Sequence, residues 1–120
     1  MDLPKGRKPI DNRWVFAVKS DGRKKAQLVV KGFSQIEGMD FDKIFSPVVH
    51  YESVQTILAM AVLEGWTITG LDIKSAFLYG PLDKEIYMCQ PEGFIIKCSE
   101  TKVLHLKRAL YGLKQAALAW

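Results

Sequence analysis

Two short segments rich in β-branched and aromatic residues lie early in the chain, on either side of a turn signal. The run Trp14–Val18 predicts a β-strand, and Gln27–Val30 predicts a returning strand. Between them, Ser20-Asp21-Gly22 is typical of a tight turn. Because Lys and Arg residues flank this turn, the sequence predicts a basic β-hairpin.

A helical spacing of apolar residues follows Ser53, which is expected to cap the helix, and Gly65 after Glu64 is a stop signal. The apolar positions recur at i, i+3, i+4, i+7 and i+8, and they are Val54, Ile57, Leu58, Ala61 and Val62. We therefore expect a helix from Val54 to Glu64. Its apolar stripe should be buried against the sheet that carries Asp72.

Trp66 and Ile68 alternate with threonines, and after Gly70 the run Leu71-Asp72-Ile73 continues the same extended segment. This pattern predicts a strand that ends with a carboxylate between two apolar neighbours. We expect Asp72 to be exposed at the strand end, with the ring of Phe77 in the same cleft.

Further short strands are predicted at 85–88 and 103–106, and the alanine-rich stretch 114–120 predicts the start of a helix. The chain shows no internal repeat. These elements together indicate an α+β fold with a mainly antiparallel sheet and packed helices.

Composition narrows the class of protein further. With 120 residues, 48% of them hydrophobic and 25% charged, the chain is expected to form one globular domain. The net charge is +4, and residues 1–32 carry nine Lys or Arg against three Asp, which suits a polyanionic partner.

No stretch is long enough to span a membrane, so we expect a soluble, intracellular protein without a membrane partner. Cys89 and Cys98 are expected to be reduced core residues, with no disulfide and no zinc.

From the pattern of apolar and polar residues alone, Asp72 is the candidate metal-binding residue. A strand end fixes the direction of a carboxylate, and the next backbone carbonyl can supply a second oxygen ligand for Mg²⁺. The alternative is an aspartate that caps the next turn, and on the residues alone this alternative is favoured.

Five blocks of sequence, in order and in register, resemble the reverse transcriptase domain of copia-type LTR retrotransposons. These blocks are Lys25–Gly32, Gly38–Asp42 with Phe45–Val48, Leu71–Gly80, Ile86–Met88 with Gln90–Phe94, and Ala109–Ala116 with Trp120. The resemblance implies a right-hand polymerase fold, in which residues 1–49 belong to the fingers and residues 50–120 to the fingers and the first half of the palm. It also implies RNA-directed DNA synthesis by two-metal nucleotidyl transfer, with Mg²⁺, an RNA or DNA template-primer, deoxynucleotides and the remainder of a Pol polyprotein as partners. The expected location is the cytoplasm, a virus-like particle or the nucleus.

The resemblance assigns roles to two parts of the Leu71–Gly80 block. Asp72 matches the first catalytic aspartate of the palm, which binds Mg²⁺ together with the carbonyl of Ile73. Phe77 matches the aromatic residue that lies under the sugar and excludes a 2′-hydroxyl, whereas without the resemblance it would be taken as a core residue.

Basic and amide residues of the other blocks are expected to contact phosphates or the nucleotide. Lys25 and Lys31 match cations of the fingers hairpin, against the alternative of a solvated ribbon face. Lys114 and Gln115 match a palm motif beneath the template and nucleotide, against the alternative of an ordinary helix start. Tyr111 is expected only to shape the turn before that helix.

The chain also departs from the family pattern. Gln27 stands where the family usually has Arg, and this removes a bidentate cation from the hairpin. The sequence stops at Trp120, before the Tyr-x-Asp-Asp carboxylates, so we expect a fragment that binds Mg²⁺ weakly and is inactive alone. A non-catalytic nucleic-acid-binding module and a nonfunctional retrotransposon remnant are the alternatives.

Overall fold

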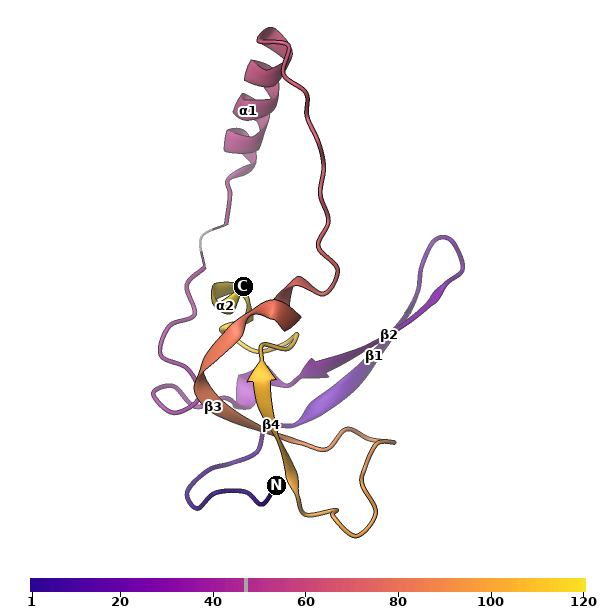
Figure 1. The fold of residues 1–120 in the computed structure, drawn as a ribbon, viewed down its shortest axis with the longest axis vertical. Coiled ribbons are helices and arrows are strands. Elements are labelled where there is room, and N and C mark those ends of the chain that lie inside the picture. The colour runs from indigo at the N-terminus through magenta and orange to yellow at the C-terminus, as the bar shows by residue number, and fades with distance from the viewer. Residues whose placement is uncertain (47) are drawn as a thin grey trace.

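The computed structural model describes residues 1–46 and 48–120, and Figure 1 shows an elongated molecule with two projections. One projection is a hairpin formed by β1 and β2, and the other is an arm that carries the helix α1. The molecule measures 63 × 39 × 19 Å, and its radius of gyration is 18.9 Å. A compact chain of this length would have a radius of about 14 Å. The expectation of a compact globular shape is therefore wrong for this chain.

The basic hairpin is confirmed. Strands β1 (Asn12–Val18) and β2 (Lys24–Val30) pair antiparallel, with Trp14 opposite Leu28. The turn between them closes through the Asp21 side chain, which accepts a hydrogen bond from the Arg23 backbone N–H at 3.0 Å. Gly22 has φ +78°, a left-handed conformation that glycine adopts without strain.

A second antiparallel pair contains both of the later predicted strands. Strand β3 (Pro81–Cys89) pairs with β4 (Val103–Arg108), with an irregularity between positions 81 and 86. Ile10 extends this pair on the other side of β3, because its N–H donates to the Tyr87 carbonyl at 2.8 Å and its carbonyl accepts from the Cys89 N–H at 3.0 Å. The fold is α+β, with two two-stranded antiparallel sheets rather than one larger sheet.

The core lies where the N-terminal segment, the end of β2, the strand β3 and the segment 109–116 meet. Its buried members are Ile10, Val30, Ile86, Met88, Ala109, Leu113 and Ala116. The hairpin is held to this core at its base, because the Val30 N–H donates to the Tyr111 carbonyl at 2.8 Å. The rest of the hairpin extends away from the body (Figure 1).

The predicted helix exists, but the prediction of its burial is wrong. Helix α1 spans Tyr51–Leu63, begins after His50 rather than at Ser53, and ends as expected where Gly65 takes φ +66°. Within the helix only Ala61 is buried, whereas Leu58 is 42% exposed and Val62 is 77% exposed. Figure 1 shows the reason: the helix stands at the end of the arm, away from both sheets, so no sheet covers its apolar stripe.

The predicted strand around Asp72 is also wrong. Residues 66–73 run back from α1 toward the body as an extended segment without strand pairing. An extended, β-branched sequence becomes a strand only when a neighbouring backbone supplies hydrogen-bond partners. Apart from the Trp66 N–H, which donates to the Ala61 carbonyl of α1 at 2.8 Å, this segment pairs with no strand, and Asp72 lies in an exposed connection.

Short helical turns complete the structure: η1 (Gly32–Ser34), η2 (Ala76–Tyr79) and α2 (Ala116–Ala119), which begins two residues later than predicted. Both cysteines are free thiols; Cys89 is half-buried, and Cys98 is exposed rather than in the core. Within residues 1–46 and 48–120, no helix has the length and apolar character needed to cross a membrane.

Candidate functional site

An open cavity of about 490 Å³, the lysine cavity, lies where the hairpin meets the body. It is lined by β2, by the chain leading into η2 and by the segment before α2: Lys19, Lys25, Ala26, Gln27, Leu28, Lys74, Ser75, Leu78, Leu110 and Tyr111. Three lysines and no acidic residue line it. A concave surface whose charged side chains are all positive attracts anionic ligands, because its walls keep water from screening the electric field.

The ring of Phe77 lies beside this cavity. Its centroid is 5.1 Å from that of Tyr111, with the two planes tilted by 55°, and Phe77 also packs against the core. Ser75, immediately before η2, takes a left-handed conformation with φ 55°, which turns the chain from the extended segment into η2. This turn places Ser75 in the cavity wall and Phe77 against Tyr111.

Asp72 and Ile73 are exposed, as expected for the aspartate, but neither lines this cavity. They lie on the unpaired extended segment, so the orientation of the carboxylate is not fixed by a sheet. Among the residues that the structure describes, no three His, Cys, Asp or Glu side chains are grouped so that they could hold a metal ion. Asp72 is therefore not part of a three-ligand metal cluster within the described residues.

Lys31 belongs to a different surface. Its Nζ lies 3.4 Å from a carboxylate oxygen of Asp11, and it lines a second open groove of about 730 Å³. That groove is aromatic as well as basic: Asn12, Arg13, Trp14, Phe16, Ala26, Lys31, Glu92, Gly93 and Phe94 line it. The rings of Trp14 and Phe94 are 5.7 Å apart, and the Trp14 indole N–H donates to the Glu92 carbonyl at 3.0 Å.

The thiol of Cys89 is close to the Lys31–Asp11 pair. Burial raises the pKa of this thiol, and a hydrogen bond and the negative charge of Asp11 raise it further. The raised pKa keeps Cys89 protonated, and a protonated thiol is a poor nucleophile. Cys89, at the end of β3, is accordingly a weaker nucleophile than a cysteine with an ordinary pKa.

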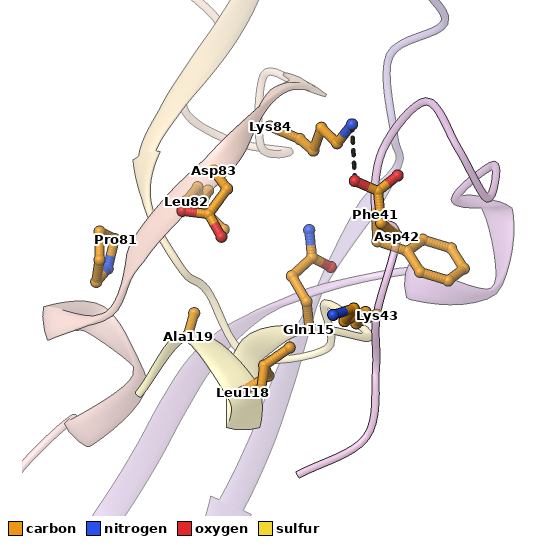
Figure 2. Close-up of a pocket in the computed structure, with 10 residues that line it drawn as sticks. All are labelled: Phe41, Asp42, Lys43, Pro81, Leu82, Asp83, Lys84, Gln115, Leu118 and Ala119. Carbon is orange, nitrogen blue, oxygen red and sulfur yellow. Dashed lines mark ion pairs between the residues drawn. The ribbon is translucent and has the colours of Figure 1, made fainter.

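Lys114 and Gln115 do not line the lysine cavity. The Lys114 Nζ lies 4.6 Å from the centre of the Phe41 ring, a cation–π contact. Gln115 is 9% exposed, and Figure 2 shows its side chain at the edge of a smaller cavity of about 200 Å³. On the opposite wall of that cavity, Lys84 and Asp42 form an ion pair of 2.9 Å.

The predicted site residues thus fall into four groups. Lys25 lines the lysine cavity together with Gln27, and Phe77 lies next to it. Lys31, the pair Lys114 and Gln115, and the pair Asp72 and Ile73 each lie elsewhere. The structure therefore brings together the hairpin lysine and the aromatic residue of the Leu71–Gly80 block.

Sequence reasoning missed Lys19 and Lys74, and gave Tyr111 only a role in a turn. Lys74 lies between Asp72 and Phe77 within one block, so its position was a usable signal. Lys19 follows the end of β1 and lines the cavity together with Lys25 of β2, and no local pattern reveals that.

Comparison with known proteins decides the family. The family model described as "Reverse transcriptase (RNA-dependent DNA polymerase)" matches residues 1–120, the whole chain. The chain belongs to the reverse transcriptase family. It is 50% identical over 125 residues to the Retrovirus-related Pol polyprotein from transposon TNT 1-94 of Nicotiana tabacum, covering 100% of the chain and 9% of the relative.

Two Pol polyproteins of Arabidopsis thaliana give the same result for this reverse transcriptase segment. The polyprotein from transposon RE1 is 48% identical and that from transposon RE2 is 47% identical, each over 113 residues, 90% of the chain and 8% of the relative. The chain spans less than a tenth of the length of these relatives. No solved structure matches it significantly.

Proposed function

We propose that this chain is the deoxynucleotide-binding part of an RNA-directed DNA polymerase within a retrotransposon Pol polyprotein. In this proposal it forms part of a right-hand polymerase fold, with residues 1–49 in the fingers and residues 50–120 in the fingers and palm. The lysine cavity is the observation that carries the proposal. It places Lys19, Lys25 and Lys74 around one concave surface, with Phe77 beside it.

The chemistry of a deoxynucleotide fits this surface. The lysines supply positive charge for the triphosphate, whose negative charge increases as the phosphoryl group is transferred. Phe77 acts as the aromatic residue that excludes a ribose 2′-hydroxyl. Because its ring packs against Tyr111 and the core, it cannot move aside easily for the additional oxygen.

Asp72 and the carbonyl of Ile73 are the proposed Mg²⁺ ligands of this chain. When bound, the ions would activate the primer hydroxyl and neutralise charge on the triphosphate. The described residues alone do not make a complete magnesium site, because no three His, Cys, Asp or Glu side chains among them are grouped around one position. Mg²⁺ takes six ligands in near-octahedral geometry, so we expect this chain by itself to bind it weakly.

The proposed partners follow from the same activity. An RNA or DNA template-primer would lie against the basic hairpin, and the remainder of the Pol polyprotein would supply the rest of the polymerase. Exposed apolar side chains along α1 support this part of the proposal, since Ile57 and Leu63 are 59% and 85% exposed. The proposed location is the cytoplasm, a virus-like particle or the nucleus.

Nucleic-acid binding without catalysis is the second candidate function, and the aromatic groove favours it. Trp14 and Phe94 offer ring faces on which bases can stack, while Arg13 and Lys31 lie close enough to contact phosphates. Such a module would bind nucleic acid weakly, without sequence preference and with a shallow salt dependence, because few Lys and Arg side chains can reach phosphates at once.

Extension of a DNA primer on an RNA template tests the proposed function. The protein to use is the complete reverse transcriptase domain that contains this chain, supplied with Mg²⁺ and the four deoxynucleotides. Extension supports the proposal. Binding of the template-primer without extension favours the second candidate, and neither binding nor extension indicates a nonfunctional remnant.

A further inference from the structure

Two buried glutamines join segments that lie far apart in the sequence. Gln35, just after η1, is 5% exposed, and its amide nitrogen donates to the side-chain oxygen of Gln115 at 2.9 Å. The oxygen of the same Gln35 amide accepts a hydrogen bond from the backbone N–H of Lys114 at 2.8 Å. One side chain therefore contacts two consecutive residues before α2.

The Gln115 side chain continues the network. Its amide nitrogen donates to the backbone carbonyl of Asp40 at 2.9 Å. Asp40 is itself fixed, because its carboxylate accepts from the Ile36 N–H at 2.8 Å and lies 3.8 Å from Arg7. The loop from Gln35 to Asp40 is consequently a closed unit that holds both ends of the network.

The hydrogen bonds of this network all have the same direction. Each amide in it donates through its nitrogen and accepts through its oxygen, from the Lys114 N–H through Gln35 and Gln115 to the Asp40 carbonyl. A side chain at position 35 must therefore accept and donate at once, which an amide does and a carboxylate or an aliphatic group does not. Buried groups that lose such partners cost free energy, so the network has one favoured arrangement.

We propose that Gln35 is a positioning residue for deoxynucleotide binding, and that it acts through Lys114 and Gln115. The inference rests on the proposed function, in which Lys114 and Gln115 lie beneath the template and nucleotide. Gln35 touches neither ligand. It fixes the backbone at Lys114 and the amide orientation of Gln115, whose side chain lines the cavity of Figure 2. Without Gln35, the Gln115 side chain keeps only its hydrogen bond to the Asp40 carbonyl.

The test uses Gln35→Leu and Gln35→Glu in the complete reverse transcriptase domain, with Gln55→Leu as matched control. Gln55 is an exposed glutamine of α1 and takes part in none of these contacts. Leucine removes both hydrogen bonds, whereas glutamate keeps the acceptor for the Lys114 N–H and loses only the donor to Gln115. We expect the KM for deoxynucleotides to rise about tenfold in both position-35 variants, with kcat changed less than about twofold.

A double-mutant cycle separates positioning from a general loss of structure. In a Gln115→Leu background, Gln35→Leu should raise the KM further by less than about twofold, because the side-chain partner Gln115 is already gone and only the hydrogen bond from the Lys114 N–H is then lost. An unchanged KM in both single variants would overturn the proposal. So would a full additional rise in the Gln115→Leu background.

Hydrogen exchange gives a readout that does not depend on activity. The Lys114 amide should exchange at least about tenfold faster in Gln35→Leu, while the Ala109 amide, bonded to Gly80, keeps its rate. Equal rates at Lys114 in wild type and variant would contradict the positioning role. If the wild-type domain makes no DNA, the proposed function fails and the catalytic part of this inference fails with it. The exchange rates then still decide whether Gln35 holds the segment.

Discussion

Gly32 and Gly112 approach each other so closely that neither can carry a side chain. A β-carbon on Gly32 would lie 2.0 Å from the carbonyl oxygen of Gly112, far inside contact distance. A β-carbon on Gly112, where φ is +94°, would lie 2.1 Å from the carbonyl oxygen of Val30. This contact joins the base of the hairpin to the turn that carries Tyr111.

Substitution of either glycine by alanine should be strongly destabilising. Gly32→Ala and Gly112→Ala both force backbone to move, and we expect each to lower the free energy of unfolding by more than about 2 kcal/mol. Gly70→Ala is the control, since a β-carbon there meets no atom within 4 Å, and its effect should stay within about 0.5 kcal/mol. Urea denaturation of the three variants measures this. Equal stability of all three variants would show that Gly32 and Gly112 have room for a β-carbon.

Two isoleucines should respond very differently to truncation. Ile86 is completely buried in β3, so Ile86→Ala should cost about 2 to 5 kcal/mol of unfolding free energy. Ile57 on α1 is 59% exposed, and Ile57→Ala should cost less than about 1 kcal/mol in this chain. Thermal or urea unfolding gives both values. A large cost at Ile57 would mean that a surface absent from this structure covers the helix.

The sequence predicts the parts of this fold that local chemistry determines. The hairpin is foreseen because Asp21 and Gly22 form its turn within a few residues, and α1 ends where Gly65 breaks it. Burial is a tertiary property, so the apolar stripe with Leu58 could not reveal that nothing covers it. The unpaired segment around Asp72 shows the same limit, since a strand pattern does not supply a partner strand.

The candidate site likewise contains residues that the sequence predicts and residues that only the structure reveals. Phe77 and Lys25 belong to recognisable blocks, and the structure places them near one cavity. Gln35 contacts Gln115 across 80 positions of sequence, and its neighbours carry no signal of that contact. Networks of this kind depend on the folded arrangement of loops, so only the structure reveals them.

The two cysteines should differ in their reactivity toward alkylating agents. Burial and Asp11 raise the pKa of the Cys89 thiol, so at pH 8 its thiolate fraction is reduced, while Cys98 is exposed. We expect iodoacetamide to modify Cys98 first. Asp11→Asn removes the negative charge and should increase the rate at Cys89, as mass spectrometry of timed samples can measure. A rate at Cys89 that is unchanged in this variant would exclude Asp11 as a cause.

Restoring the arginine that the family usually has at position 27 should strengthen binding of deoxynucleotides. Gln27 lines the lysine cavity, and an arginine there adds a bidentate, permanently charged contact for phosphate oxygens. In the complete domain, Gln27→Arg should lower the KM for deoxynucleotides roughly threefold to tenfold. Gln55→Arg adds the same charge on α1, distant from the cavity, and should leave the KM unchanged. An equal effect of both variants would indicate a general effect of charge instead.

Single-nucleotide addition by Asp72→Asn is the decisive measurement for the proposal that Asp72 is a catalytic metal ligand. The complete domain is loaded with an RNA template and a DNA primer, and the rate of the first addition is measured together with template-primer affinity. Asp83→Asn is the control, because Asp83 is also an exposed aspartate. We predict that Asp72→Asn lowers the rate by at least about a thousandfold with unchanged affinity, since one metal-binding carboxylate is lost. Nucleotide addition at the wild-type rate by Asp72→Asn would show that Asp72 is not a catalytic metal ligand.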